Sequence, residues 1–270
     1  DILLGEAYTV SQQDLRRVMH QFFDQVIYRL WAERGVASTK LAYVSKIDGV
    51  KQVVISDYDG FHRSQVTRDT VISMMPVWMK GNKGLVYVSF KTHRPKLYSK
   101  MFGGVEKVLF PHLDQTYSPA VNPVTGELLF SNTVDGKTDL FIGDPKTGRA
   151  RKFAYLKSNQ TSPAWSPGAR EVLFTSDRGG GPQIFAMGKD GSDMRRITFM
   201  GRYNERASWS PSGDRIAYTS MDNGKMNIYT CALDGSDIVQ LTSDAGNNEH
   251  PTWSPDGKLI AFSSNRSGSY

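Results

Sequence analysis

The side chains that most often carry catalysis are few in this sequence and widely spaced. The five histidines share no metal-ligand spacing, and His20 falls within a helical pattern that predicts a structural role. The single cysteine, Cys231, has no partner for a disulfide or a metal site and stands in an apolar strand pattern, so we expect a small buried core residue. No Gly-x-Ser-x-Gly elbow occurs, and Ser192 belongs to a repeated turn. The sequence therefore predicts no catalytic residue, no metal site and no cofactor.

Two further patterns resemble ligand-binding loops only in part. Gly179-Gly180-Gly181 does not stand between a strand and a helix, as a phosphate-binding loop requires. The segments 190–193 and 234–237 have part of the spacing of a calcium loop but lack its downstream glutamate. We interpret both patterns as turns.

The composition is typical of a globular protein, with 39% hydrophobic and 22% charged residues. The formal charge of +6 is scattered along the chain, whereas nucleic-acid binders gather positive charge into a patch. No apolar run approaches the roughly eighteen residues that a membrane-spanning helix needs. We therefore expect no nucleic-acid partner, and an association with membranes only through other proteins.

The elements that position these residues follow an internal repeat. Five segments that begin or resemble Pro-x-Trp align without gaps, and their third residues are 43, 44, 44 and 44 positions apart. These third residues are Trp78, Val121, Trp165, Trp209 and Trp253. A large indole at this repeated position predicts packing between neighbouring repeats, because it covers a large apolar area.

Each period contains four short apolar runs separated by turns rich in Gly, Pro, Ser and Asp, which predicts four strands per repeat. A single four-stranded sheet buries too little surface to stand alone, so stacking such sheets around an axis is the favoured solution. We expect an all-β, six-bladed β-propeller that begins near Lys40. Six periods need roughly 264 residues from that point and 231 are present, so the last blade is expected to be incomplete.

Residues 1–36 show a different pattern, and we expect them to form the strand–helix end of a small N-terminal α/β domain, with the propeller over 37–270. Residues 1–10 are predicted to form a strand. An apolar stripe at helical spacing follows, with Ser11 at its start and Gly35 as its stop. The stripe consists of Leu15, Val18, Met19, Phe22, Phe23, Val26, Ile27 and Leu30. We expect it to pack against another part of that domain, rather than against the propeller or a partner.

The Pro-x-Trp-Ser-Pro-x-Gly segments and the Asp-Gly turns resemble the TolB-type propeller repeat. Residues 5–45 resemble the junction at which the last strand and helix of that family's N-terminal domain enter the first blade, and Ser56 to Gly60 match its first blade. The resemblance covers essentially the whole chain. It implies a non-enzymatic periplasmic component of the bacterial Tol–Pal system, which maintains the outer membrane during cell division. It further implies binding to the peptidoglycan-associated lipoprotein Pal, and to other Tol proteins through the N-terminal domain.

In that family Pal docks on loops just before the Pro-x-Trp segments, which here are residues 114–118, 158–162, 203–206 and 247–250. The family's threonine is present as Thr161, whereas its histidine in the preceding blade is replaced by Gln115. Independently of family, these loops join an outer strand to the next inner strand, so they must surround the axis on one face, where function concentrates. The candidate partner-binding residues are Gln115, Tyr117, Asn159, Thr161, Asn204, Glu205, Asn248, Glu249 and His250.

Two other functions are compatible with a propeller. The chain could be the propeller of a prolyl-oligopeptidase-like serine peptidase, in which a separate hydrolase domain carries the catalytic triad. It could also be a sugar- or ligand-sensing propeller, which would present aromatic side chains toward the axis. A hydrolase extension in the full-length gene would favour the peptidase, and a stop soon after position 300 would favour the docking module.

Overall fold

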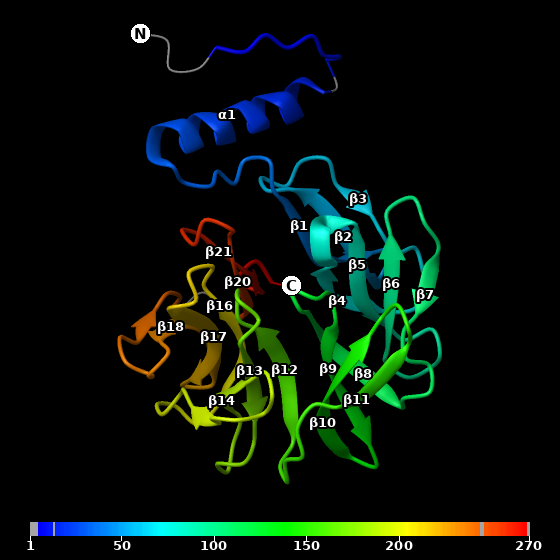
Figure 1. Cartoon of the computed structure of the whole chain (residues 1–270), viewed down its shortest axis with the longest axis vertical. Coiled ribbons are helices and arrows are strands. Elements are labelled where there is room, and N and C mark those ends of the chain that lie inside the picture. Colours follow the sequence, from blue (N-terminus) through cyan, green and yellow to red (C-terminus); the bar gives the residue numbers. More distant parts are fainter. Residues whose placement is uncertain (1–4, 13, 244–245, 269–270) are drawn as a thin grey trace.

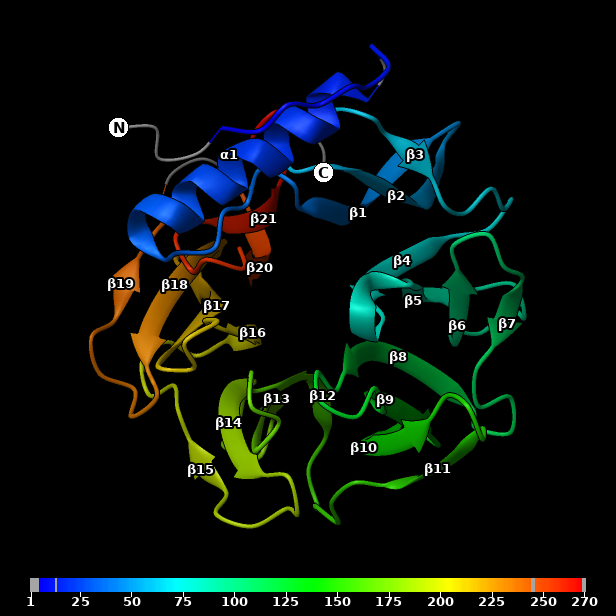
Figure 2. The ribbon, with the colours of Figure 1, turned by 45° about the horizontal axis from the view of Figure 1, so that its top comes forward.

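The computed structural model describes residues 5–12, 14–243 and 246–268, and its strands form six separate antiparallel sheets that follow one another along the chain. The first sheet has three strands, the next four have four strands each, and the last has two. Figures 1 and 2 show these sheets set around a common axis in sequence order. The β-propeller fold is therefore confirmed. The six-bladed ring stays a prediction, because the first and last sheets are incomplete in the described part of the chain.

The strand boundaries follow the repeat. The first sheet contains β1 (Lys40–Ile47), β2 (Val50–Asp57) and β3 (Ser64–Gln65), and the second contains β4 (Ser73–Trp78), β5 (Gly84–Ser89), β6 (Lys96–Met101) and β7 (Glu106–Val108). The third contains β8 (Gln115–Val121), β9 (Leu128–Val134), β10 (Lys137–Asp144) and β11 (Arg149–Lys152). The fourth contains β12 (Gln160–Trp165), β13 (Glu171–Ser176), β14 (Gln183–Gly188) and β15 (Arg195–Arg196). The fifth contains β16 (Asn204–Trp209), β17 (Arg215–Asp222), β18 (Lys225–Ala232) and β19 (Val239–Gln240), and the last contains β20 (Asn248–Trp253) and β21 (Ile260–Ser264). A short 3₁₀ helix, η1 (Lys80–Asn82), joins β4 to β5.

The strands that carry the Pro-x-Trp motif lie closest to the axis, and the next three strands of each complete sheet follow outward. Contacts run in series from β4 to β8, β12, β16 and β20, so these five strands surround the axis. The second strand of each sheet is apolar on both faces because neighbouring sheets cover it. In β13, for example, Val172, Leu173 and Phe174 are all buried.

The repeated tryptophan joins neighbouring sheets, as expected. Trp209 packs in a buried cluster with Leu173 and Ile184 of the preceding sheet, and its indole N–H donates to the carbonyl of Ala164 at 3.1 Å. One repeat later, the indole N–H of Trp253 donates to a carbonyl of the fifth sheet at 3.3 Å. Trp209 therefore contributes both apolar area and a hydrogen bond between sheets, and Trp253 contributes a hydrogen bond.

The helix α1 (Leu15–Trp31) forms where the apolar stripe predicts it, with a start and a stop that differ in detail. The hydroxyl of Ser11 accepts a hydrogen bond from the N–H of Asp14, the residue that caps the helix. The helix ends at Trp31, and Ala32 follows in a left-handed conformation, so the expected stop at Gly35 is wrong. The expected strand over residues 1–10 is also wrong where it can be judged. Residues 5–10 form no strand, and residues 1–4 lie outside the described residues.

Gly35 has a different role, because a side chain there would collide with α1. A Cβ at this position would stand 2.6 Å from the Cα of Asp24. The Asp24 carboxylate in turn accepts hydrogen bonds from the N–H groups of Ala37 and Ser38, each at 2.8 Å. Gly35 therefore allows the linker to lie against the helix while Asp24 holds it there.

The helix rests on the propeller through part of its surface only. Arg16 forms an ion pair with Asp59 in the turn after β2, and Glu33 forms one with Lys258 in the turn after β20. Val18 is the buried residue of the helix, whereas other members of the apolar stripe, such as Phe23, are exposed. The assignment of residues 1–36 to a separate domain stays a prediction. In the residues that the structure describes, no helix is both long and apolar enough to cross a membrane.

Candidate docking site at the rim of the propeller

The segments 114–118, 158–162, 203–206 and 247–250 lie together at one end of the propeller, and we call them the rim. The expectation that they are loops is wrong for most of their residues, which form the first part of the inner strands β8, β12, β16 and β20. Each segment leads into an inner strand, and the inner strands run in the same direction around the axis, so their starting ends meet. The turns that contact α1 follow β2 and β20. Successive strands of each sheet run in opposite directions, so both of these turns lie at the end of the propeller opposite the rim. The helix therefore leaves the rim uncovered.

One repeated position on the rim combines partial exposure with varied chemistry. It lies two residues before the residue that aligns with the motif proline, and it pairs with a residue near the end of the second strand, as Thr161 pairs with Thr175. All its side chains are half-buried. The set is Met74, Tyr117, Thr161, Glu205 and Glu249. Four of these five residues are among the candidate partner-binding residues, and the structure brings them to one edge of the ring.

The position immediately before is buried in every repeat, and this removes two candidates from the accessible surface. Asn204 and Asn248 are both 0% exposed. The amide of Asn204 donates to the side chain of Gln183 at 2.9 Å and to the carbonyl of Met200 at 2.8 Å. These asparagines hold neighbouring segments together, so they support the rim rather than face a partner.

Three other candidates on the rim differ in how many hydrogen bonds their side chains form within the protein. The Asn159 side chain accepts from the N–H of Thr138 at 3.0 Å and donates to Asp177 at 2.7 Å, so both ends of its amide are used. The hydroxyl of Tyr117 forms hydrogen bonds with Thr133 and Thr138 at 2.8 and 3.0 Å. Gln115 begins β8 and is half-buried. Hydrogen bonds therefore hold the side chains of Asn159 and Tyr117 in one orientation, in which a partner would have to bind them.

Two carboxylates gather around one tyrosine on the rim. The hydroxyl of Tyr203 donates to a carboxylate oxygen of Glu205 at 3.0 Å. Burial, together with the charges of Glu205 and Glu249, raises the pKa of Tyr203 to about 12. The phenol of Tyr203 is therefore protonated at neutral pH.

A basic group lies next to it, around His250. His250 is an exposed residue, but the protein atoms around its ring desolvate the charged form of the imidazole. This desolvation, together with the positive charges of Arg206 and Lys51, lowers the pKa of His250 to about 4. Arg206 was not among the candidates chosen from the sequence, although it directly follows Glu205. Its place one repeat before His250 is the signal that would have identified it.

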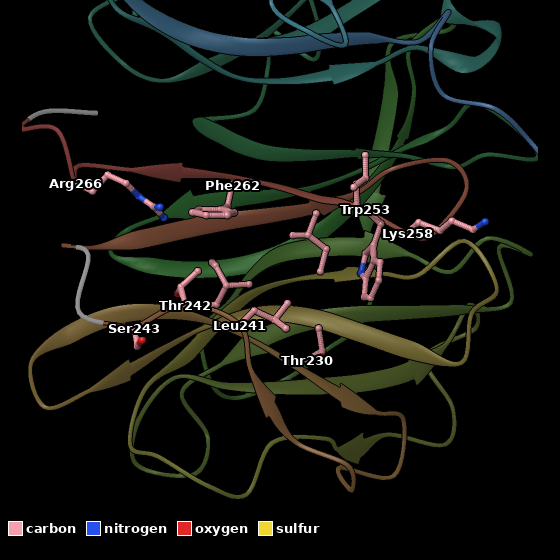
Figure 3. A pocket seen from close by; sticks show the side chains of 11 residues that line it. Thr230, Leu241, Thr242, Ser243, Trp253, Lys258, Phe262 and Arg266 are labelled. Atoms are coloured by element: carbon pink, nitrogen blue, oxygen red, sulfur yellow. Dashed lines mark hydrogen bonds between the residues drawn. The ribbon is translucent and has the colours of Figure 1, made fainter. Parts of the chain in front are cut away.

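Two further features concern metal ions and small ligands. Within 5–12, 14–243 and 246–268, no three His, Cys, Asp or Glu side chains are grouped closely enough to hold a metal ion. A cavity of about 640 Å³ lies between the fifth sheet and β21 (Figure 3). Most of its lining residues are apolar, including Trp253, Leu241 and Phe262. The cavity lies beside the two-stranded sheet of β20 and β21.

Comparisons with known proteins give a consistent result. A family model described as TolB beta propeller domain matches residues 27–270. A relative from Gluconobacter oxydans, named Tol-Pal system protein TolB, is 28% identical over 147 residues, which are 53% of this chain and 32% of the relative. A relative of the same name from Pasteurella multocida is 36% identical over 112 residues, which are 40% of this chain and 26% of the relative.

Among solved structures, TolB from Acinetobacter baumannii is similar to this chain with a TM-score of 0.83 and 24% sequence identity. The match covers 96% of this chain and 66% of that one. At this identity the similarity supports the fold alone. The chain thus spans no more than two thirds of the length of each of these relatives.

Proposed function

The chain belongs to the TolB β-propeller domain family, and from this premise we propose that it is a non-enzymatic protein-docking module of the bacterial envelope. Its partner would be the peptidoglycan-associated lipoprotein Pal, bound at the rim. The observation that carries the proposal is the rim itself: a half-buried position of varied chemistry recurs there on successive inner strands, while α1 lies at the opposite end of the propeller. Rigid scaffolds that present variable loops are typical of recognition surfaces.

The partner-binding residues proposed for this function are a subset of the candidates from the sequence. Thr161, Glu205 and Glu249 have the accessible position, and Gln115 and His250 flank it. Asn204 and Asn248 act by fixing the loops. Adaptable polar side chains around a few accessible carboxylates suit a polar, transient interface.

The complete protein is proposed to have three further features. A six-bladed ring would place additional strands beside β21, where they would cover the cavity lined by Trp253 and Leu241. An N-terminal α/β domain would pack on the exposed apolar residues of α1, such as Phe23, and would bind other Tol proteins. The protein would act in the periplasm, since its partners are there.

Calorimetry of the full-length protein with purified Pal tests the proposal. We expect saturable binding, weakened at least fivefold by Glu205→Arg and by Glu249→Arg, because each reverses a charge in the contact surface. Asp237→Arg is the matched control. Asp237 is exposed and lies in the turn between β18 and β19, at the end of the propeller opposite the rim.

The outcomes separate the alternatives. Binding that Glu205→Arg and Asp237→Arg weaken equally would remove the docking site from the rim. No binding at high micromolar concentration would refute Pal as the partner and would favour the peptidase-associated propeller, which then predicts a hydrolase domain in the full-length gene.

A further inference from the structure

A β-bulge turns two side chains of neighbouring inner strands out of the regular ladder. The register shifts between Glu205 and Ser208 in β16 and at the equivalent point in β20. Arg206 and His250 occupy the bulges with φ of 54° and 58°, the left-handed region that non-glycine residues seldom adopt. Their N–H groups donate to threonine hydroxyls of the preceding sheets, each at 3.2 Å. The backbone therefore places both residues at equivalent positions of neighbouring inner strands.

The guanidinium of Arg206 forms an ion pair with Glu205 but no side-chain hydrogen bond among the described residues. Its side chain is 27% exposed, and its nearest carboxylate oxygen, on Glu205, lies 3.6 Å from Nε, which is too long for a hydrogen bond. The Nε–H is buried without an acceptor among the described residues. The second oxygen of Glu205 accepts from Tyr203 instead. The buried Nε–H is out of a partner's reach, whereas the two terminal nitrogens form no hydrogen bond with the described residues, so these are the groups that can donate to a bound anion.

Charges of both signs lie close together on this part of the rim. Glu205 and Glu249 raise the pKa of Tyr203 while Arg206 lowers it, and Arg206 and Lys51 both lower the pKa of His250. The two positive charges near His250 attract an anion, and the nearby carboxylates disfavour a group with more than one negative charge. A planar guanidinium matches the two oxygens of a carboxylate.

We propose that Arg206 and His250 form a carboxylate-binding subsite on the rim, which takes an aspartate, a glutamate or a chain-terminal carboxylate of the docking partner. The guanidinium donates to the carboxylate oxygens, and the imidazole lies beside them. The identity of the partner rests on the docking function proposed above, whereas the subsite itself does not.

The subsite can be tested without a protein partner. Sodium acetate is titrated into the full chain, with sodium chloride at equal ionic strength as the reference, while the His250 imidazole signal is followed by NMR and assigned with His250→Gln. We expect a saturable shift of the imidazole signal with acetate only, measured near neutral pH where acetate is fully ionised.

Arg206→Gln should abolish that response, and Arg202→Gln, a change of an exposed arginine four residues earlier, should preserve it. An equal response to acetate and chloride, or an unchanged acetate response in Arg206→Gln, would overturn the subsite.

The second arm uses purified Pal. We expect Arg206→Gln to weaken binding about tenfold and Arg206→Lys to weaken it less, since lysine keeps the charge but loses the planar fork. Normal Pal binding by Arg206→Gln would refute the subsite's role in docking. Failure of the unmodified chain to bind Pal while acetate still binds at Arg206 would refute the docking proposal and leave the subsite standing.

Discussion

Two tryptophans at the same position of neighbouring repeats differ in one hydrogen bond, and this difference predicts unequal effects of the same substitution. The indole N–H of Trp209 donates to the Ala164 carbonyl at 3.1 Å, whereas the indole N–H of Trp165 is buried without an acceptor among the described residues. Their side chains are similarly buried, at 8% and 9% exposure. Trp209→Phe should therefore destabilise the protein more than Trp165→Phe.

The magnitude follows from what each change removes. Both substitutions delete a similar apolar area, so the loss of burial largely cancels in the comparison. Trp209→Phe additionally removes a hydrogen bond between sheets, while Trp165→Phe removes an unsatisfied donor. The difference in the free energy of unfolding should be about 1–2 kcal/mol. In urea this corresponds to a midpoint roughly 0.5 M lower for Trp209→Phe.

Urea unfolding followed by far-UV circular dichroism measures the two midpoints without relying on tryptophan fluorescence. Trp165→Phe also keeps an aromatic ring opposite Phe153, whose ring centroid lies 6.0 Å from that of Trp165. If Trp165→Phe lowers the midpoint as much as Trp209→Phe does, the hydrogen bond between sheets contributes nothing and the reasoning is refuted.

Two further predictions concern the linker and the buried thiol. Gly35→Ala should release the linker from Asp24 at a cost of about 1–3 kcal/mol, seen as faster limited proteolysis after α1, and Gly168→Ala, which has space for a methyl group, should not. Burial raises the pKa of the Cys231 thiol to about 11. Alkylation of this thiol in the native protein should therefore be slow at pH 8 and become fast only when urea unfolds the protein. Rapid alkylation of the native protein would contradict this prediction.

The repeat predicted the order of strands because its cause is local. Turn residues at fixed offsets and short apolar runs specify each strand, and the first strand begins at Lys40 as expected. The end of α1 was predicted less well, because Gly35 satisfied the usual rule for a helix stop while its actual function is to admit the close approach of Asp24. That contact joins residues eleven positions apart and leaves no local signal.

The rim was predicted only in outline. The bulge in each inner strand places a non-glycine residue at φ between 50° and 58°, a conformation for which sequence rules expect Gly or Asn. These residues are Met75, Ser118, Ser162, Arg206 and His250. Neighbouring sheets impose this conformation, so no local pattern predicts the role of Arg206. The polarity of Asn204 and Asn248 predicts exposed side chains, whereas both are buried.

Two adjacent rim positions differ in burial, and under the docking function proposed above this difference would separate folding from recognition. The position occupied by Asn204 and Asn248 is buried in all five inner strands, and it is filled by small or amide side chains that can hydrogen-bond inside the ring. The next position is half-buried and carries methionine, tyrosine, threonine and glutamate in different repeats. Substitutions at the second position can therefore change the charge and shape of the rim while the first keeps the loops in place. A ring built in this way can acquire a new partner without altering its fold.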